Sequence, residues 1–184
     1  MQRPGDFPPL AALGRRIMVL GPTNSGKSTL AESIAVHLGV PAVHLDQFRH
    51  LAGTNWRQRP DAEFKLLHDE SVAMDAWIMD GSYSKLMPPR LARATGIIVL
   101  DDTLLVRTAR YFCRTLFQKH RPGGLEGNRD SIKWEMLVWL WKTRDKSGDA
   151  RRLAIETGLP HIFVHNRRQL DALYAAWTLI PATA

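Results

Sequence analysis

The sequence has little of what secreted and membrane-spanning proteins need. Its 184 residues include one cysteine, Cys113, which excludes an internal disulfide and a zinc site built from paired cysteines. No uninterrupted apolar run approaches the roughly 18 residues that a membrane helix requires. The stretch from Met1 to Leu13 holds three prolines and an aspartate but no sustained apolar run, so it does not resemble a cleaved signal. These absences predict a cytoplasmic protein with no membrane segment.

The composition is that of an ordinary folded domain with an excess of positive charge. Hydrophobic residues make up 45% and charged residues 23% of the chain, which favours a buried core over disorder. Lysine and arginine number 25 against 18 acids, a net charge of +7. Such a balance predicts an anionic partner, but nucleic acids, acidic membranes and nucleotide phosphates all satisfy it.

Short apolar runs alternate with longer segments of helical period, which predicts an α/β fold with a five-stranded parallel sheet covered by helices in three layers. The expected strands are 16–21, 40–45, 77–80, 96–101 and 161–165. The expected helices are 27–38, 60–76, 103–120, 131–146, 149–158 and 167–177. We therefore expect one domain over 16–177, an N-terminal extension over 1–15 and a C-terminal tail over 178–184. Ligands of such sheets bind at the carboxyl ends of the strands.

The strongest motif lies between the first expected strand and the first expected helix. It is the phosphate-binding loop (P-loop) pattern Gly-x4-Gly-Lys-Ser, whose backbone N–H groups and helix N-terminus bind polyphosphate. Lys27 is expected to reach the β- and γ-phosphates of ATP, and the Ser28 hydroxyl to hold Mg²⁺. The predicted nucleotide-binding residues here are Gly21, Pro22, Thr23, Asn24, Ser25, Gly26, Lys27, Ser28 and Thr29.

Other features of the chain narrow the class of nucleotide-binding protein. The Asn-Lys-x-Asp sequence with which GTPases bind guanine is missing after the last strand, where His165-Asn166-Arg167-Arg168 stands instead. The signature of transporter ATPases is also missing. A small-molecule kinase remains. Its Mg²⁺-linked acid should end a buried strand, and we favour Asp80 over Asp101, for which helix capping is a good alternative.

Arginines gather after the fourth expected strand. Arg107, Arg110 and Arg114 are three and four residues apart and would form one stripe on a helix, with Arg121 following beside a glycine-rich loop. Guanidinium groups on a closing lid can stabilise the charge of a migrating phosphoryl group and exclude water. For any single arginine, a solvated basic surface is the competing interpretation.

These residues together resemble the adenylate-kinase-like P-loop kinases, and more narrowly the bacterial topology modulation (FlaR-like) group. The resemblance rests on the P-loop, His44-Leu45-Asp46, Asn55-Trp56, the run from Trp77 to Ser84 and the arginine series. It implies sheet order 2-3-1-4-5, a substrate-binding insertion at about 46–76 and a helical lid at about 107–146.

The resemblance also implies roles for individual residues. Asp80 takes the place of the acid near Mg²⁺, and Gly81 and Tyr83 follow it on the acceptor side. Asp46 resembles an acid that contacts an acceptor hydroxyl, with helix capping as its alternative, and Arg49 resembles an arginine that binds an acceptor phosphate. Ser84 stands where adenylate kinases carry a second such arginine, which weakens the expectation of an AMP acceptor. Adenine is expected near Asn166 and Arg168.

The sequence thus predicts an enzyme, a kinase that transfers the γ-phosphate of ATP, with Mg²⁺, to a small-molecule acceptor, with nucleotides among the candidates. The alternative is a nucleotide-binding regulatory ATPase that acts on a macromolecular partner such as DNA. No helix-turn-helix or zinc-finger pattern supports that alternative. The sequence assigns no role to the tryptophan-rich segment 134–141 and does not give the acceptor's identity or the oligomeric state.

Overall fold

The structure is a computed structural model that describes residues 7–54, 56–103, 106–109, 112 and 146–181. Most of the predicted lid and the tryptophan-rich segment 134–141 therefore lie outside the described residues. So do three of the predicted catalytic arginines, Arg110, Arg114 and Arg121.

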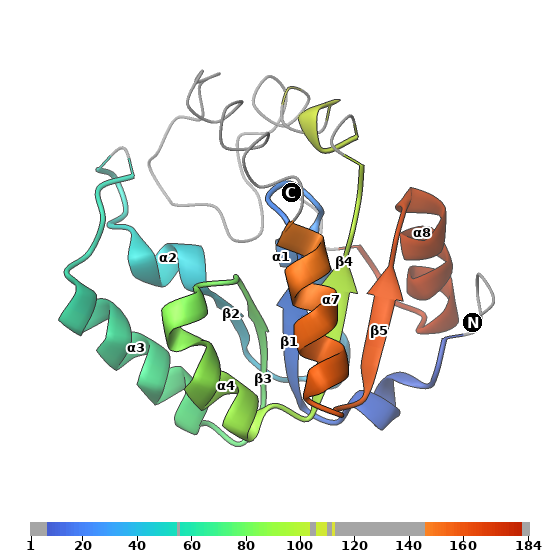
Figure 1. Ribbon diagram of the computed structural model, residues 1–184, viewed down its shortest axis with the longest axis horizontal. Helices are drawn as coiled ribbons and strands as arrows, with labels where there is room; N and C mark the ends of the chain where they lie inside the picture. The colour runs from blue at the N-terminus through green and yellow to red at the C-terminus, as the bar shows by residue number, and fades with distance from the viewer. Residues whose placement is uncertain (1–6, 55, 104–105, 110–111, 113–145, 182–184) are drawn as a thin grey trace.

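A five-stranded parallel sheet forms the centre of the molecule, as predicted (Figure 1). Its strands are β1 (Arg16–Leu20), β2 (Ala42–His44), β3 (Trp77–Asp80), β4 (Gly96–Leu100) and β5 (His161–Val164). They are ordered β2-β3-β1-β4-β5, which confirms the expected order. The two central neighbours of β1 are buried over their whole length, because a parallel sheet covered on both faces has apolar side chains on both.

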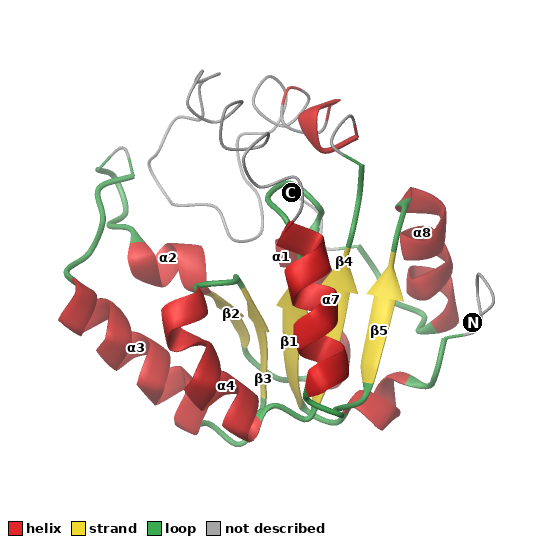
Figure 2. Cartoon of the chain, viewed as in Figure 1, coloured by secondary structure: helices red, strands yellow, loops and turns green. Residues whose placement is uncertain are grey.

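Helices cover both faces of this sheet (Figure 2). On one face, α1 (Lys27–Leu38) and α8 (Arg167–Ala176) pack their leucines and Ile34 against apolar side chains of β1, β3, β4 and β5. On the other face lie α3 (Asp61–Ala73), α4 (Met87–Arg93) and α7 (Lys146–Glu156). The three-layer arrangement predicted from the alternation of strands and helices is therefore confirmed.

Three elements that the sequence analysis did not predict follow β2 and β3. Helix α2 (Leu45–Arg49) begins directly after β2, and the 3₁₀ turn η2 (Ser84–Leu86) after β3 leads into helix α4, which was not predicted either. Helix α4 carries Pro88 and Pro89 in its first turn, where proline replaces no hydrogen bond of the helix. Both α2 and η2 lie at the carboxyl edge of the sheet, so they bring side chains toward the P-loop.

The segments predicted as an N-terminal extension and a tail both contact the core. The 3₁₀ turn η1 (Leu10–Leu13) buries both of its leucines, and Leu179 is buried as well. The Trp177 indole N–H, just before the predicted tail, donates to the Pro8 carbonyl oxygen at 2.9 Å, which ties the N-terminal segment to the end of α8. Among the helices of the described ranges, none combines the length and apolar character needed to cross a bilayer.

Candidate active site

The P-loop runs from the end of β1 to the first turn of α1 in a strained backbone conformation. Gly21 has a φ of 137°, and a Cβ atom there would lie 2.2 Å from the Leu100 carbonyl oxygen at the end of β4. Asn24 and Gly26 also have positive φ, 64° and 95°. Successive turns of this kind orient backbone N–H groups toward one point, and the N-terminus of α1 adds its partial positive charge. The loop can therefore bind a polyphosphate.

Polar side chains inside the loop fit the same ligand. The Lys27 ammonium donates to the Pro22 carbonyl oxygen at 2.8 Å, so it lies folded over the loop. Both polar atoms of the Asn24 amide are buried and make no hydrogen bond. A buried amide without a partner is costly, and phosphate oxygens beside it would offer acceptors.

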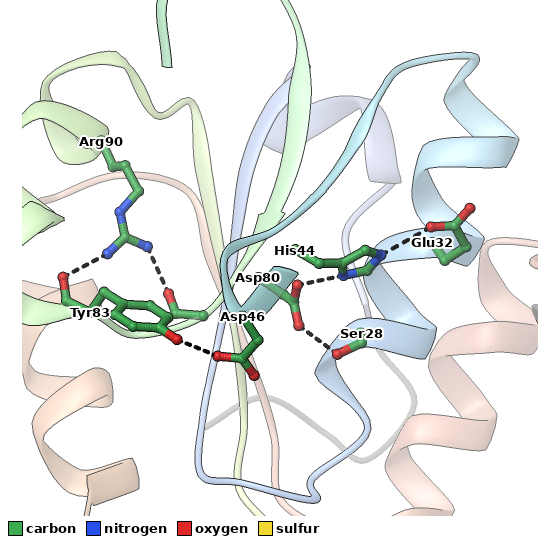
Figure 3. Close-up of polar contacts among 8 residues, drawn as sticks. Ser28, Glu32, His44, Asp46, Asp80, Tyr83 and Arg90 are labelled. Carbon is green, nitrogen blue, oxygen red and sulfur yellow. Dashed lines mark hydrogen bonds and ion pairs between the residues drawn. The ribbon is translucent and has the colours of Figure 1, made fainter. Parts of the chain in front are cut away.

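The first turn of α1 and the end of β3 meet beside the loop. Ser28 Oγ donates to Asp80 Oδ2 at 2.7 Å, and the Asp80 side chain is buried (Figure 3). A hydroxyl and a carboxylate are the oxygen ligands that Mg²⁺ prefers, directly or through water. The pair that the sequence analysis favoured as metal-linked is thus in direct contact, and its donor set fits Mg²⁺.

His44 completes this cluster, and the sequence analysis assigned it no role. The sheet register places His44 opposite Asp80, and its Nδ1 lies 2.6 Å from Asp80 Oδ1. Its Nε2 lies 3.2 Å from a carboxylate oxygen of Glu32, one turn beyond Ser28 on α1. Burial lowers the pKa of His44, but hydrogen bonds and charge from Asp80 and Glu32 outweigh it, so the pKa is raised. His44 therefore donates from both ring nitrogens when protonated and fixes the Asp80 carboxylate.

A second polar pair lies where α2 approaches the loop after β3. Gly81 has a φ of 119°, and a Cβ atom there would lie 3.0 Å from Leu45 Cβ. This close approach brings Asp46 of α2 to Tyr83, whose hydroxyl donates to Asp46 Oδ1 at 2.6 Å (Figure 3). Burial and the charges of Asp46 and Asp80 raise the Tyr83 pKa, so this phenol keeps its proton.

A buried arginine of α4 holds the loop after β3 in place. Arg90 is fully buried and donates to the carbonyl oxygens of Gly81 at 2.7 Å, Ser82 at 2.5 Å and Tyr83 at 3.1 Å. Burial lowers its pKa to about 10, so it remains a cation at neutral pH. Sequence reasoning missed Arg90, because no residue near it in the chain marks α4 as part of the site.

Arg49, predicted to bind an acceptor phosphate, contacts the segment that leads into α3. Its Nη1 donates to Asp61 Oδ1 at 2.5 Å and to the Arg59 carbonyl oxygen at 3.1 Å. Its Nη2 donates to Gln58 Oε1 at 2.7 Å, and its guanidinium lies 5.4 Å from the centre of the Phe64 ring. Arg49 thus connects α2 to residues 58–61 at the start of α3.

Arg107 is the predicted lid arginine that the structure describes. It is 1% exposed, and its Nε donates to the Thr23 carbonyl oxygen of the P-loop at 2.9 Å. Burial lowers its pKa, while the charges of Asp101 and Asp102 raise it and do not fully compensate. The first residues after β4 are therefore tied to the phosphate-binding loop.

A small hollow beside the P-loop is lined by Asn166, one of the two residues near which adenine is predicted, but not by Arg168. Its lining includes Ser25, Leu100, Val164, Asn166 and Leu170. The Asn166 side chain accepts from the Gln169 backbone N–H at 3.0 Å and so caps α8, while Arg168 is exposed.

Asp101, the competing candidate for the metal-linked acid, lines the same hollow. It lies 3.0 Å from Arg151 Nη1 and 3.8 Å from His165 Nδ1. Within the described residues, Ser28 Oγ donates to Asp80 and not to Asp101. The geometry therefore favours Asp80.

Comparison with known proteins gives structural neighbours among solved proteins. No protein-family model and no curated protein sequence matches the chain. A shikimate kinase from Bacteroides thetaiotaomicron is similar with a TM-score of 0.50 and 19% identity, over 89% of this chain and 96% of that one. A shikimate kinase from Acinetobacter baumannii, solved with shikimate, is similar with a TM-score of 0.51 and 17% identity, over 91% and 94% of the two chains.

The chain has the P-loop NTPase fold. At these identities the similarity extends to the fold alone, and the site has to be argued from its own residues. The narrower resemblance to the topology modulation group is not confirmed by these comparisons and stays a prediction.

Proposed function

We propose that the protein is an ATP- and Mg²⁺-dependent phosphotransferase that acts on a small-molecule acceptor. One observation carries the proposal: Ser28 and Asp80 meet at 2.7 Å beside the P-loop, at the same edge of the sheet as the Asp46–Tyr83 pair. A nucleotide-binding loop by itself is found in motor proteins, in switch GTPases and in kinases, and does not distinguish them. A second polar pair next to it supplies a place for the molecule that receives the phosphoryl group.

On the nucleotide side, the backbone of residues 21–26 and the Lys27 ammonium would bind the triphosphate. Ser28 and Asp80 would hold Mg²⁺, which neutralises charge on the β- and γ-phosphates when it is bound. His44 keeps the Asp80 carboxylate oriented toward Ser28. Arg107 would hold the segment after β4 against the P-loop through its hydrogen bond to the Thr23 carbonyl oxygen. We also propose that Arg110, Arg114 and Arg121 neutralise the charge of the transferred phosphoryl group.

On the acceptor side, Asp46 and Tyr83 face the end of β3 from two different elements. The charge of Asp80 contributes to the raised pKa of Tyr83, so the two pairs lie close enough to interact. Direct transfer needs the acceptor in line with the γ-phosphate, and this proximity is compatible with it.

The direct test measures ADP release and acceptor phosphorylation. The protein would be mixed with MgATP and pools of sugars and polyols, hydroxy acids, and nucleoside monophosphates, with Lys27→Ala as the matched control. We expect one pool to stimulate ADP release in the natural protein but not in Lys27→Ala, and a phosphorylated product to appear by mass spectrometry. Loss of Lys27 should cost at least about 100-fold in rate, as for other groups that stabilise transition-state charge.

Two results would contradict the proposal. The first is the absence of heat when MgATP is titrated into folded protein in a calorimeter. The second is ATP hydrolysis that DNA or another protein stimulates while no pool is phosphorylated. That second result would favour a regulatory ATPase.

A further inference from the structure

The amide oxygen of Asn24 is a polar group of the P-loop to which the proposed binding of MgATP gives no partner. We propose that Asn24 Oδ1 binds a monovalent cation of the size of K⁺, held between this amide and the phosphates of the bound nucleotide. The inference rests on the proposed function in one respect, that the loop binds MgATP. It adds a second cation beside Mg²⁺.

The first argument is the burial of the Asn24 side chain. Both Oδ1 and Nδ2 are buried, and neither has a hydrogen-bond partner among the described residues. Folded proteins leave few buried polar atoms unpaired, and an unpaired atom inside a binding loop points to a group that binds there. Because the amide carries one acceptor oxygen and a donor NH₂ group, the bound groups must satisfy two opposite kinds of atom.

The second argument is the backbone conformation of the loop at this residue. Asn24 has a φ of 64°, in the left-handed region, where Gly21 and Gly26 of the same loop also have positive φ. Asparagine tolerates this region better than most residues, but glycine adopts it with less strain and buries no amide. The backbone conformation therefore does not by itself explain the buried side chain, and ligand binding does.

The third argument is that a triphosphate satisfies only half of the amide. Phosphate oxygens accept hydrogen bonds, so they can pair with the Nδ2–H groups of Asn24. They cannot pair with Oδ1, because both oxygens carry negative charge and repel each other. Oδ1 therefore needs a donor or a cation between itself and the phosphates.

The cationic side chains at the loop contact other oxygens. Lys27 Nζ donates to the Pro22 carbonyl oxygen at 2.8 Å, and Arg107 Nε donates to the Thr23 carbonyl oxygen at 2.9 Å. Neither contact includes the Asn24 amide, which stays without a partner among the described residues. A cation from solution is therefore the group that fits Oδ1.

The chemistry of the ligand favours a monovalent cation over a second Mg²⁺. The hydroxyl and carboxylate that suit Mg²⁺ are those of Ser28 and Asp80, which meet at 2.7 Å. Asn24 offers a neutral carbonyl oxygen, and its neighbours Thr23 and Ser25 are uncharged. Neutral carbonyl oxygens are the ligands that replace the hydration shell of K⁺. The charge of this ion would lie beside phosphates on which negative charge develops during transfer.

The first experiment titrates MgATP into the natural protein in a calorimeter, in KCl, NaCl, LiCl or choline chloride at equal ionic strength. Because two ligands that favour each other's binding share one coupling free energy, K⁺ should lower the Kd of MgATP at least about fivefold relative to choline. Na⁺ and Li⁺ should have smaller effects.

Two kinds of failure are distinguishable in this experiment. Equal Kd values in the four salts, or a stronger effect of Na⁺ or Li⁺ than of K⁺, would overturn the proposed cation site and leave the proposed function standing. Absence of heat in every salt would contradict the proposed function itself, and the inference would fall with it.

The second experiment repeats the titrations with Asn24→Gly, which removes the amide and suits the φ of 64°. The ratio of the Kd values in choline chloride and KCl should fall below about twofold, because the coupling is lost with the ligand oxygen. The matched control is Gln58→Ala, which removes an amide oxygen that accepts from Arg49 Nη2 at 2.7 Å before α3. It should keep the K⁺ effect of the natural protein.

A K⁺ effect that persists in Asn24→Gly would overturn the assignment of Asn24 as the ligand. Loss of the effect in Gln58→Ala as well would also overturn it, since removal of either amide would then act in the same way. The comparison of salts on the natural protein tests the cation site even if Asn24→Gly does not fold.

Discussion

Ser28 and Asp80 are 52 positions apart in the chain, yet their side chains share a hydrogen bond of 2.7 Å. The sheet order explains the contact. Strand β3 pairs with β1 in parallel, with Asp80 opposite Val19, so the acid that ends β3 lies beside the loop that leaves β1. Helix α1 then places Ser28 at the same edge. A cation held between them would lie beside the amides that bind phosphate.

Replacement of Asp80 by asparagine should weaken the Mg²⁺ dependence of the proposed phosphotransferase activity. The amide keeps the shape of the carboxylate but removes its charge, and it accepts from Ser28 through one oxygen only. We expect the Mg²⁺ concentration for half-maximal activity to rise about 10- to 100-fold, the usual effect of losing a supporting ligand. The measurement is a Mg²⁺ titration of ADP release at fixed ATP.

Asp101→Asn is the matched control for this titration, because Asp101 directly follows β4 and pairs with Arg151. It should change the Mg²⁺ requirement less than about threefold, since its charge acts on Arg151 and not on the metal. A larger effect at Asp101 than at Asp80 would reverse the assignment of the metal-linked acid.

The P-loop should tolerate no side chain at Gly21. An alanine Cβ there would lie 2.2 Å from the Leu100 carbonyl oxygen, and the φ of 137° is strained for any residue with a side chain. We expect Gly21→Ala to lower the free energy of unfolding by at least about 2 kcal/mol, as measured by urea denaturation.

Gly39→Ala provides the comparison for Gly21→Ala. Gly39 also has a positive φ, 61°, but a Cβ atom there meets nothing within 4 Å. Gly39→Ala should lower the free energy of unfolding only by the cost of a left-handed backbone conformation, about 1 kcal/mol. Equal losses at the two positions would show that the close approach of the P-loop to β4 is unimportant for stability.

Arg90→Met should destabilise the loop after β3. The change leaves the carbonyl oxygens of Gly81, Ser82 and Tyr83 without their donor, and a buried polar group that loses its partner costs about 1–3 kcal/mol. We therefore expect a loss of about 3 kcal/mol in the free energy of unfolding. Arg93→Met, in the same helix, removes one hydrogen bond of its guanidinium to Met74 and should cost about 1 kcal/mol. A smaller loss at Arg90 than at Arg93 would contradict the role given to Arg90.

The buried histidines His44 and His68 should affect stability in opposite directions as pH changes. Contacts with Asp80 and Glu32 raise the His44 pKa against the effect of burial, so its stabilisation is present below the unfolded pKa of about 6.5 and is lost as pH rises through the folded pKa. Burial and the nearby Arg90 charge lower the His68 pKa, despite opposition from Asp69. The stabilisation by His68 is therefore present above about pH 6.5 and is lost as pH falls through its folded pKa.

The measurement is the free energy of unfolding of His44→Gln, His68→Leu and the natural protein between pH 5 and pH 8. The difference between natural protein and His44→Gln should grow as pH falls, and the difference for His68→Leu should shrink. Parallel pH dependence of the two differences would show that at least one of these pKa shifts has the wrong sign.

The sequence by itself determined the fold and the position of the P-loop. Apolar runs of strand length alternate with amphipathic segments, and only a parallel sheet with crossover helices accommodates that order. The P-loop motif is local, because its glycines, Lys27 and Ser28 act within eight consecutive residues. The strand and helix pattern and the P-loop motif can both be found from residues close together in the chain. The predicted bounds of β3 and α1 therefore match the observed Trp77–Asp80 and Lys27–Leu38.

Only the tertiary structure decided which distant side chains meet. Asp46 and Tyr83 lie 37 positions apart on elements too short to show a period, and their contact depends on the close approach of Gly81 to Leu45. Arg90 lies in a helix that begins with prolines, and Arg49 has partners that follow it by about ten residues. Contacts of this kind arise from packing and from charge neutralisation across elements, which leave no periodic pattern in the chain.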